Sequence, residues 1–224
     1  MQIQPENYPE EYITGSVHFF GREYMITPDV LIPRLETECL VRRARKVIQE
    51  CHITQVIDIG CGSGIIGTSV ADLVDEVIFL DISGEALHIS GKNLRTHFPE
   101  KNTQFIVSDL LSELKVTSSN SHILLVTNLP YIKDEDWIHM SSDTIYEPKL
   151  ALFGWEKTGF ELYEKLFEQI QILRTKYEWK ITILFEFGFD QRKIAENILR
   201  SYPDWKYSFF ADYAGIERFG EIKL

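Results

Sequence analysis

Residues 56–67 read Val-Ile-Asp-Ile-Gly-Cys-Gly-Ser-Gly-Ile-Ile-Gly, an apolar run that leads into a glycine-rich turn and a second apolar run. Glycines at positions 60, 62 and 64 let the backbone turn tightly and approach a ligand where a Cβ would clash. A helix that follows such a turn points its unpaired N–H groups at the same place. We therefore expect a strand, a ligand-binding turn and a helix, with Asp58 as an acidic group beside the turn.

The glycine pattern alone leaves the ligand open. Residues 62–67 also fit the dinucleotide fingerprint, and Asp81 follows at about the distance of a ribose-binding acid. An acidic Asp58 suits the sulfonium and ammonium groups of S-adenosylmethionine better than it suits a pyrophosphate. A nicotinamide cofactor, S-adenosylmethionine and a plain strand-to-helix turn remain the alternatives, and the rest of the chain has to decide between them.

Length and composition predict one globular domain. The chain has 224 residues, enough to bury one core, of which 44% are hydrophobic and 25% charged. No apolar run is long enough to span a bilayer, and the first five residues lack the basic and apolar segments of a signal peptide. We therefore expect one α/β domain that works in the cytoplasm, away from membranes.

Cysteine, histidine and charge narrow the function classes. The three cysteines form no Cys-x-x-Cys pair and the six histidines no His-x-x-x-His pair, so neither disulfides nor a metal site are expected. The formal net charge of −11 argues against a protein that grips a long stretch of phosphate backbone. A nucleic-acid partner is therefore not expected, although a local basic patch stays open.

Apolar runs alternate with longer amphipathic stretches, which is typical of a parallel sheet with crossover helices. We expect strands at 56–59, 76–80, 104–107, 122–127 and 181–187. Helices are expected at 35–51, 65–73, 84–98, 159–177 and 191–202, where apolar residues recur at three- and four-residue spacing. The tail, 206–224, reads as a terminal hairpin. The predicted fold is an α/β Rossmann-like sheet, mostly parallel with a C-terminal antiparallel hairpin, with helices on both faces.

Three expected strands end in a polar residue. Asp81, Asp109 and Asn128 would all lie at the carboxyl edge of the sheet, where open α/β sheets bind ligands. Asp81 can accept hydrogen bonds from two ribose hydroxyls and Asp109 from an adenine amino group. The alternative is that each aspartate caps the helix that follows it. Their joint position favours cofactor binding.

Residues 128–131, Asn-Leu-Pro-Tyr, suit the methylation of an amide or aromatic amine. Such a nitrogen is a poor nucleophile, and its lone pair must be aimed by acceptors on its hydrogens. The Asn128 side-chain oxygen and the Leu129 carbonyl can take one N–H each and stabilise the charge that develops on nitrogen. Pro130 stiffens the loop, and Tyr131 offers a face for stacking. Out of this context, Asn-x-Pro is more often a turn.

With these motifs in place, the chain resembles the HemK-type protein glutamine N5-methyltransferases, over nearly its whole length. The resemblance is carried by Tyr-Ile-Thr-Gly at 12–15 through Phe-Gly at 20–21, and by Leu-Ile-Pro-Arg-Leu-Glu-Thr-Glu at 31–38. The second is similar to the family's Leu-Ile-Pro-Arg-Pro-Glu-Thr-Glu. Tyr-Glu-Pro at 146–148, followed by Ala-Leu-Phe-Gly at 151–154, is a further family-like run.

The resemblance implies a class I methyltransferase, which converts S-adenosylmethionine to S-adenosylhomocysteine. Its acceptor would be the glutamine of the Gly-Gly-Gln loop in a peptide-chain release factor, a step linked to translation termination. Residues 34–38 would close over the methionine end of the cofactor, although acids here also suit the first turn of a helix. The residues expected to bind the cofactor are Arg34, Thr37, Glu38, Asp58, Gly60, Cys61, Gly62, Gly64, Asp81, Ile82, Asp109, Leu110 and Asn128. Those expected to carry the chemistry are Asn128, Leu129, Pro130 and Tyr131.

The chain departs from the family pattern in two places. Leu129 stands where the family usually has proline and is typical of the ribosomal RNA adenine dimethyltransferases, yet a role through its carbonyl survives the change. Family members also carry a helical domain before the Tyr-Ile-Thr-Gly segment, so we expect a short form that lacks this domain. Residues 1–35 are then an N-terminal and cofactor-closing segment and 36–224 the methyltransferase domain. Trp155 and the acidic run 134–136 are expected near the acceptor mouth.

Two other enzyme classes stay open at this point. A nucleic-acid amino methyltransferase of the adenine N6 type is supported by Leu129 and by the missing helical domain, but it needs a basic surface. A nicotinamide oxidoreductase has no role for residues 128–131, and neither has a binding module without catalysis. A protein glutamine methyltransferase, acting as a monomer on a release factor, is the favoured hypothesis.

Overall fold

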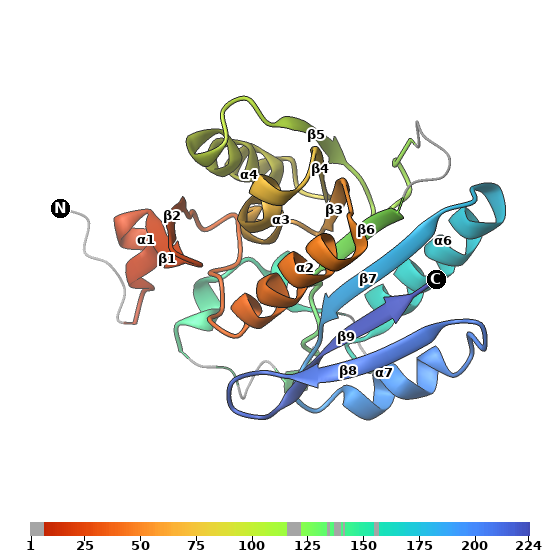
Figure 1. The fold of residues 1–224 in the computed structure, drawn as a ribbon. Helices are drawn as coiled ribbons and strands as arrows, with labels where there is room; N and C mark the ends of the chain where they lie inside the picture. The colour runs from red at the N-terminus through yellow and green to blue at the C-terminus, as the bar shows by residue number, and fades with distance from the viewer. Residues whose placement is uncertain (1–6, 116–121, 134, 137–139, 141, 155–156) are drawn as a thin grey trace.

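A seven-stranded sheet organises the molecule (Figure 1). The computed structural model describes residues 7–115, 122–133, 135–136, 140, 142–154 and 157–224. The strands of the sheet are β3 (Gln55–Ile59), β4 (Glu76–Asp81), β5 (Asn102–Val107), β6 (His122–Thr127), β7 (Lys180–Glu186), β8 (Lys206–Ala211) and β9 (Glu217–Lys223). In space their order is β5-β4-β3-β6-β7-β9-β8. The first five run parallel, and β9 runs antiparallel to both of its neighbours.

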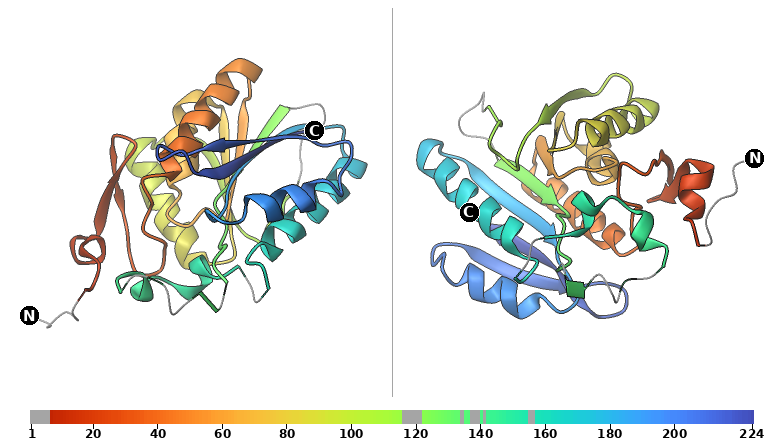
Figure 2. Two further views of the ribbon diagram at one scale, coloured as in Figure 1. Left: turned by 90° about the horizontal axis from the view of Figure 1, so that it is seen from below. Right: turned by 180° about the vertical axis from the view of Figure 1, so that it is seen from behind.

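Helices cover both faces of the sheet (Figure 2). On one face lie α2 (Thr37–Cys51), α3 (Ile65–Val70) and α4 (Gly84–His97), and on the other α6 (Glu161–Lys176) and α7 (Arg192–Leu199). Side chains alternate along a strand, so Val56 packs under the first group while its neighbour Ile57 packs under the second. Both strand faces are therefore apolar, which is why these strands read as continuous hydrophobic runs.

The expected fold class is confirmed. The five predicted parallel strands and the C-terminal hairpin all form, with ends that shift by one or two residues. The helix expected at 65–73 divides into α3 and a short 3₁₀ turn, η1 (Ala71–Leu73). Among the described residues between β6 and α6 lie η3 (Thr144–Tyr146) and α5 (Lys149–Leu152).

The N-terminal segment contains a small folded unit that the sequence did not predict. It consists of α1 (Glu10–Thr14) and an antiparallel pair, β1 (Ser16–Phe19) and β2 (Arg22–Met25), at one end of the molecule (Figure 1). The two-residue turn between the strands, Phe20 and Gly21, has φ values of 47° and 74°. Positive φ at both central residues is the geometry that matches the twist of a tight hairpin.

One side chain joins this hairpin to the glycine turn. Asn93 of α4 is 2% exposed, and its Oδ1 accepts a 2.7 Å hydrogen bond from the Met25 N–H. Its Nδ2 donates to the Met25 carbonyl at 3.0 Å and to the Ser63 carbonyl at 2.8 Å. Because hairpin, helix and turn share one amide, the N-terminal segment packs against the domain that the seven-stranded sheet organises. The division of the chain after residue 35 stays a prediction.

The described residues contain neither a membrane-spanning helix nor a cluster of metal-binding side chains. None of the helices there is long and apolar enough to cross a membrane. Within the same residues, no three or more histidine, cysteine or acidic side chains gather in a way that could hold a metal ion.

Candidate active site

A cavity of about 540 Å³ lies at the carboxyl edge of the parallel strands. Its wall takes residues from the turns after β3, β4, β5 and β6 and from the segment before α2. A pocket of this size can enclose most of a cofactor-sized ligand. The wall includes many of the expected site residues, namely Arg34, Thr37, Gly60, Cys61, Gly62, Asp81, Ile82, Asp109, Leu110, Asn128, Leu129 and Pro130.

The glycine turn after β3 uses its glycines for two purposes. Gly62 has a φ of 53° and lines the cavity, and a Cβ there would meet no described atom within 4 Å. That side of the turn is therefore open for a ligand to approach the backbone. Gly64 serves packing instead, because a Cβ there would lie 2.6 Å from the Cβ of Ser90 in α4. Because Gly64 has no Cβ, α3 and α4 can pack closely.

Asp58 lies behind the turn, and the cavity wall as described does not include it. Its side chain is 1% exposed, and its Oδ2 accepts a 2.8 Å hydrogen bond from the Gly67 N–H in α3. Burial raises the pKa of this carboxyl to about 8, so the neutral form dominates at pH 7. Contact between a charged Asp58 and a cationic ligand stays a prediction. In this structure the carboxyl joins β3 to α3.

Asp81 ends β4 on the cavity wall. Its two oxygens each accept a 2.9 Å hydrogen bond, one from the Gly62 N–H and one from the Ser83 N–H. The cap of α4 is Ser83, whose Oγ accepts from the Ala86 N–H at 3.2 Å. The helix-cap alternative is therefore wrong for Asp81, and its carboxylate holds the glycine turn against the end of β4.

Asp109 follows β5 and forms an ion pair with Lys165 of α6. Both residues line the cavity, and both side chains are 46% exposed. The backbone at Leu110 has a φ of 56°, and a turn rather than a helix follows. Asp109 is thus not a helix cap. An adenine amino group bound here would share the Asp109 carboxylate with the Lys165 ammonium.

The Asn-Leu-Pro-Tyr segment is held by partners from three other elements. The Asn128 Nδ2 donates a long hydrogen bond of 3.5 Å to the Oγ1 of Thr37 at the start of α2. The Leu129 N–H donates to the Tyr163 hydroxyl at 2.9 Å. The Tyr131 carbonyl accepts from the side chain of Gln191 at 2.8 Å. Tyr131 is absent from the wall that the described residues form, so its stacking role stays a prediction.

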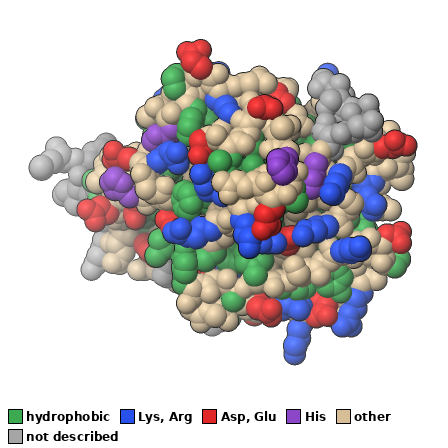
Figure 3. Space-filling view, in the orientation of Figure 1, with side chains coloured by type: hydrophobic (Ala, Val, Ile, Leu, Met, Phe, Trp, Pro, Cys, Tyr) green, Lys and Arg blue, Asp and Glu red, His purple; other side chains and the backbone are tan. Residues whose placement is uncertain are grey.

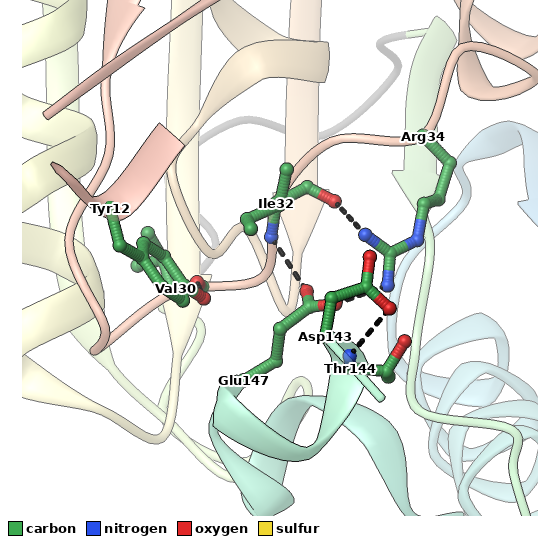
Figure 4. Close-up of polar contacts among 7 residues, drawn as sticks. All are labelled: Tyr12, Val30, Ile32, Arg34, Asp143, Thr144 and Glu147. Carbon is green, nitrogen blue, oxygen red and sulfur yellow. Dashed lines mark hydrogen bonds and ion pairs between the residues drawn. The ribbon is translucent and has the colours of Figure 1, made fainter. Parts of the chain in front are cut away.

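The segment before α2 is fastened to the other side of the cavity by an ion pair (Figure 4). Arg34 pairs with Glu147, which also accepts a 2.9 Å hydrogen bond from the Ile32 N–H. The Arg34 Nη1 donates back to the Ile32 carbonyl at 3.0 Å. Because Glu147 lies after η3, this pair joins two distant segments across the cavity. Trp155 and Asp134, expected near the acceptor mouth, lie outside the described residues.

Glu38, at the start of α2, has its hydrogen-bond partners in the N-terminal hairpin and in α2 itself. It accepts a 2.9 Å hydrogen bond from the Phe20 N–H and a 3.1 Å bond from Arg42. The described cavity wall does not include it. Its observed partners fasten the N-terminal hairpin to α2, and a cofactor contact by Glu38 stays a prediction.

Sequence reasoning missed Glu186, a fully buried carboxyl at the end of β7. Its Oε2 accepts a 2.8 Å hydrogen bond from the Thr37 hydroxyl, and its Oε1 has no hydrogen-bond partner among the described residues. Burial raises the pKa of Glu186 to about 7. An acid inside an apolar strand was the available signal, since carboxylates are almost never fully buried without a reason.

The face over α2 carries basic side chains that are paired with acids (Figure 3). Arg42 pairs with Glu38, Arg43 with Glu221, Arg45 with Asp72 and Lys46 with Glu50. In Figure 3 blue side chains form a band across this face, with a few red ones among them. A phosphate backbone would have to compete with these carboxylates for the basic side chains.

Comparison with solved structures shows the fold. The human METTL16 catalytic domain bound to an RNA hairpin has a TM-score of 0.68 at 14% identity, covering 91% of this chain and 75% of that one. The ribosomal protein L11 methylase from Lactobacillus delbrueckii subsp. bulgaricus has a TM-score of 0.57 at 16% identity, covering 85% of this chain and 79% of that one. Both are methyltransferases with the class I architecture.

Comparison with known sequences shows the family. The profile of the Methyltransferase small domain matches residues 37–147. The release factor glutamine methyltransferase of Enterococcus faecalis is 33% identical over 95% of this chain and 74% of its own length. Those of Clostridium botulinum and Bacillus subtilis are 33% and 30% identical, each over 97% of this chain and 76% of their own lengths. The HemK-type resemblance is thereby confirmed, and the nucleic-acid and nicotinamide alternatives are not favoured. The chain belongs to the release factor glutamine methyltransferase family.

Proposed function

We propose that this protein transfers a methyl group from S-adenosylmethionine to the side-chain amide nitrogen of a glutamine in a peptide-chain release factor. One observation carries the proposal. The cavity brings a glycine turn and Asp81, which suit the cofactor, together with Asn128, which suits an amide acceptor. The names of the curated relatives support the release factor as the protein partner. Because release factors act on ribosomes, we also propose the cytoplasm as its place of action.

The residues present fit S-adenosylmethionine. Asp81 keeps oxygen lone pairs beyond its two backbone hydrogen bonds, so it can accept from ribose hydroxyls at the cavity wall. The open side of Gly62 leaves room for the cofactor to lie on the turn. Asp109 with Lys165 would meet the adenine end, and Arg34 and Thr37 the methionine end. When bound, the cofactor supplies an electrophilic methyl group on a sulfonium; a structural neighbour, the human METTL16 N-terminal domain, was solved with SAH.

The chain's own contribution to chemistry is to orient the acceptor nitrogen. Asn128 on the cavity wall presents a side-chain amide, and Leu129 beside it presents a backbone carbonyl. Each can accept one hydrogen of the glutamine amide, which turns the nitrogen lone pair toward the methyl group. The same acceptors stabilise the positive charge that grows on nitrogen in the transition state. No strong general base is needed, because the nitrogen carries a positive charge after it accepts the methyl group and is then acidic enough to release one of its protons.

Methyl transfer to purified substrates tests this proposal. The protein is incubated with methyl-labelled S-adenosylmethionine and either an unmethylated release factor or total RNA. We expect label in the release factor, located by mass spectrometry on the glutamine of its Gly-Gly-Gln loop. A release factor with glutamate at that place is the matched control, because it offers no N–H to Asn128 and should take no label. Label in RNA, with none in the release factor at any concentration, would overturn the proposal.

A further inference from the structure

A row of three side chains runs from the cavity to the buried end of β7. The Asn128 Nδ2 donates to the Thr37 Oγ1, and the Thr37 Oγ1 donates to the Glu186 Oε2 at 2.8 Å. Asn128 and Thr37 line the cavity, whereas Glu186 is 0% exposed and lies behind Thr37. The Glu186 carboxyl is therefore linked to the cavity through Thr37 and Asn128.

The number of hydrogens in this row determines which way the Asn128 amide points. An ionised carboxylate can only accept hydrogen bonds, and a threonine hydroxyl has one hydrogen to give. When Glu186 is ionised, that hydrogen goes to Glu186, so Thr37 is left as an acceptor for Asn128. Only the NH₂ end of the Asn128 amide can satisfy an acceptor. The Asn128 oxygen must then point the other way.

We infer that Glu186 is a positioning residue, which takes the single hydrogen of Thr37 and so holds the Asn128 amide with its oxygen toward the acceptor nitrogen. The inference rests on the proposed function, in which that oxygen receives a substrate N–H. Reversal of the Asn128 amide would place its NH₂ group against the substrate NH₂ group. Two donors would then face each other and the nitrogen would lose its alignment.

A protonated Glu186 permits this reversal. Its O–H can donate to Thr37, which frees the Thr37 hydrogen to donate to the Asn128 oxygen. The 3.5 Å separation between Asn128 and Thr37 leaves room for either arrangement before ligands bind. Catalytic hydrogen bonds are often long in ligand-free structures and shorten in the complex.

The charges around Glu186 place its ionisation in the physiological range. Burial is the main cause that raises its pKa to about 7. Glu36 before α2 raises it further, and Arg218 of β9 and Arg34 lower it, as does the Thr37 hydrogen bond. Two tyrosine side chains also face it, Tyr131 after β6 and Tyr163 of α6. The row therefore changes state as pH crosses neutrality.

The pH dependence of kcat separates positioning from a merely structural role. For the wild type, kcat toward a release factor should fall as pH drops below 7 and level off about ten- to hundredfold lower, once Glu186 is protonated. Glu186→Gln should lower kcat at pH 8 about ten- to hundredfold. It should also abolish the fall of kcat at low pH, the acid limb of the profile, because a neutral amide at position 186 no longer fixes the direction of the hydrogen bonds between Thr37 and Asn128. Thr37→Val should also lose the limb, and Thr37→Ser, which keeps the hydroxyl, should keep it.

Glu221→Gln is the matched control. Glu221 is 3% exposed and lies on β9 opposite Leu184 of β7, where it pairs with Arg43 and Lys223. Its replacement removes a buried carboxyl from the same part of the sheet without touching the row. The kcat and the acid limb of this variant should match the wild type. An unchanged acid limb in Glu186→Gln would overturn the inference.

A second readout needs no substrate and no folded variant of Glu186. In ¹⁵N-labelled wild-type protein, the Asn128 side-chain NH₂ signal is the one that disappears in Asn128→Ala. This signal should shift with pH through a single titration near 7, in step with the ¹³C signal of the Glu186 carboxyl. An Asn128 signal that does not move while Glu186 titrates would refute the coupling. If the wild type labels no release factor but the signals titrate together, the proposed function fails and the inference on the amide stands.

Discussion

The two halves of the cavity are built in different ways. In the half formed by β3 and β4, the polar contacts join residues close in sequence, 19 apart for Gly62 and Asp81 and 9 apart for Asp58 and Gly67. In the half formed by β6 and β7, they join residues far apart, 149 for Thr37 with Glu186 and 91 for Asn128 with Thr37. The first half is a local motif, and the second exists only in the folded chain.

The two halves also differ in how the oxygens of Asp81 and Glu186 are satisfied. Both Asp81 oxygens accept a backbone N–H, so the cofactor half keeps its shape through its own backbone. The acceptor half contains a fully buried Glu186, whose Oε1 has no hydrogen-bond partner among the described residues. Unsatisfied buried groups cost stability, and they persist where function needs them. We conclude that the cofactor half is made for binding and the acceptor half for chemistry.

The largest expected effect tests whether Asn128 serves chemistry rather than binding. Asn128→Ala should reduce methyl transfer by about two to three orders of magnitude, as the loss of one transition-state hydrogen-bond partner does. Affinity for S-adenosylmethionine, measured by calorimetry, should stay nearly unchanged. Normal turnover by this variant would remove the distinction between the two halves.

The second effect tests whether Glu186 lowers stability. Its pKa is about 7 in the folded protein against a reference value of 4.5, so the folded state holds a proton that the unfolded chain releases between these pH values. The wild type should therefore lose stability as pH rises through that window. Relative to Glu186→Gln, the loss between pH 4.5 and 8 should be about 2 to 3 kcal/mol. Denaturant melts of both proteins across this range would measure it, and parallel curves would contradict it.

The third effect concerns the cofactor half. Asp81→Ala should weaken S-adenosylmethionine binding by roughly 1.5–3 kcal/mol, the scale of hydrogen bonds to a charged group. Asp81→Asn is the control, since it keeps the shape and an oxygen but loses the charge, and its loss should be smaller. Calorimetry on both variants measures the difference. Unaltered affinity in Asp81→Ala would show that the turn binds the cofactor without this carboxylate.

The smallest effect sharpens the role of Leu129. Leu129→Pro gives the residue usual in the family and keeps the carbonyl, so kcat should change only a few-fold. It removes the N–H that donates to the Tyr163 hydroxyl, which should cost about 1 kcal/mol of stability. Leu129→Met keeps this N–H and should leave stability closer to the wild type in thermal melts. A large loss of kcat in Leu129→Pro would mean that the side chain itself takes part.

The sequence was sufficient for the sheet and for the ends of its first four strands. Strand-like apolar runs gave β3 to β7 because parallel strands are covered on both faces. Asp81, Asp109 and Asn128 were found because each stands at the point where such a run stops, and all three line the cavity. The residues that form a turn or end a strand lie close together in sequence, so both features can be predicted from a single sequence.

Other features could not be found in this way, each for a physical reason. Asp58 was expected to face the ligand, but it shares its strand face with Val56 and so points toward α3. Glu186 was treated as an interior residue of a strand. Its partner, Thr37, lies 149 residues away, so the sequence around Glu186 gives no sign of the contact. The pairing of Arg34 with Glu147, 113 residues apart, likewise depends on how the segments meet in space.

The amide of Asn93 makes the N-terminal hairpin and the glycine turn open together. It holds Met25 of β2 with two hydrogen bonds and the Ser63 carbonyl with a third. We expect a fluctuation that moves Asn93 to loosen both β2 and the turn, so that the two segments exchange their amide hydrogens as one cooperative unit. A ligand bound on the turn stabilises the state in which these hydrogen bonds are formed. It should therefore slow hydrogen exchange at the Met25 amide as well, by the same factor. The first strands of the chain thus report on an occupied cavity that they do not line.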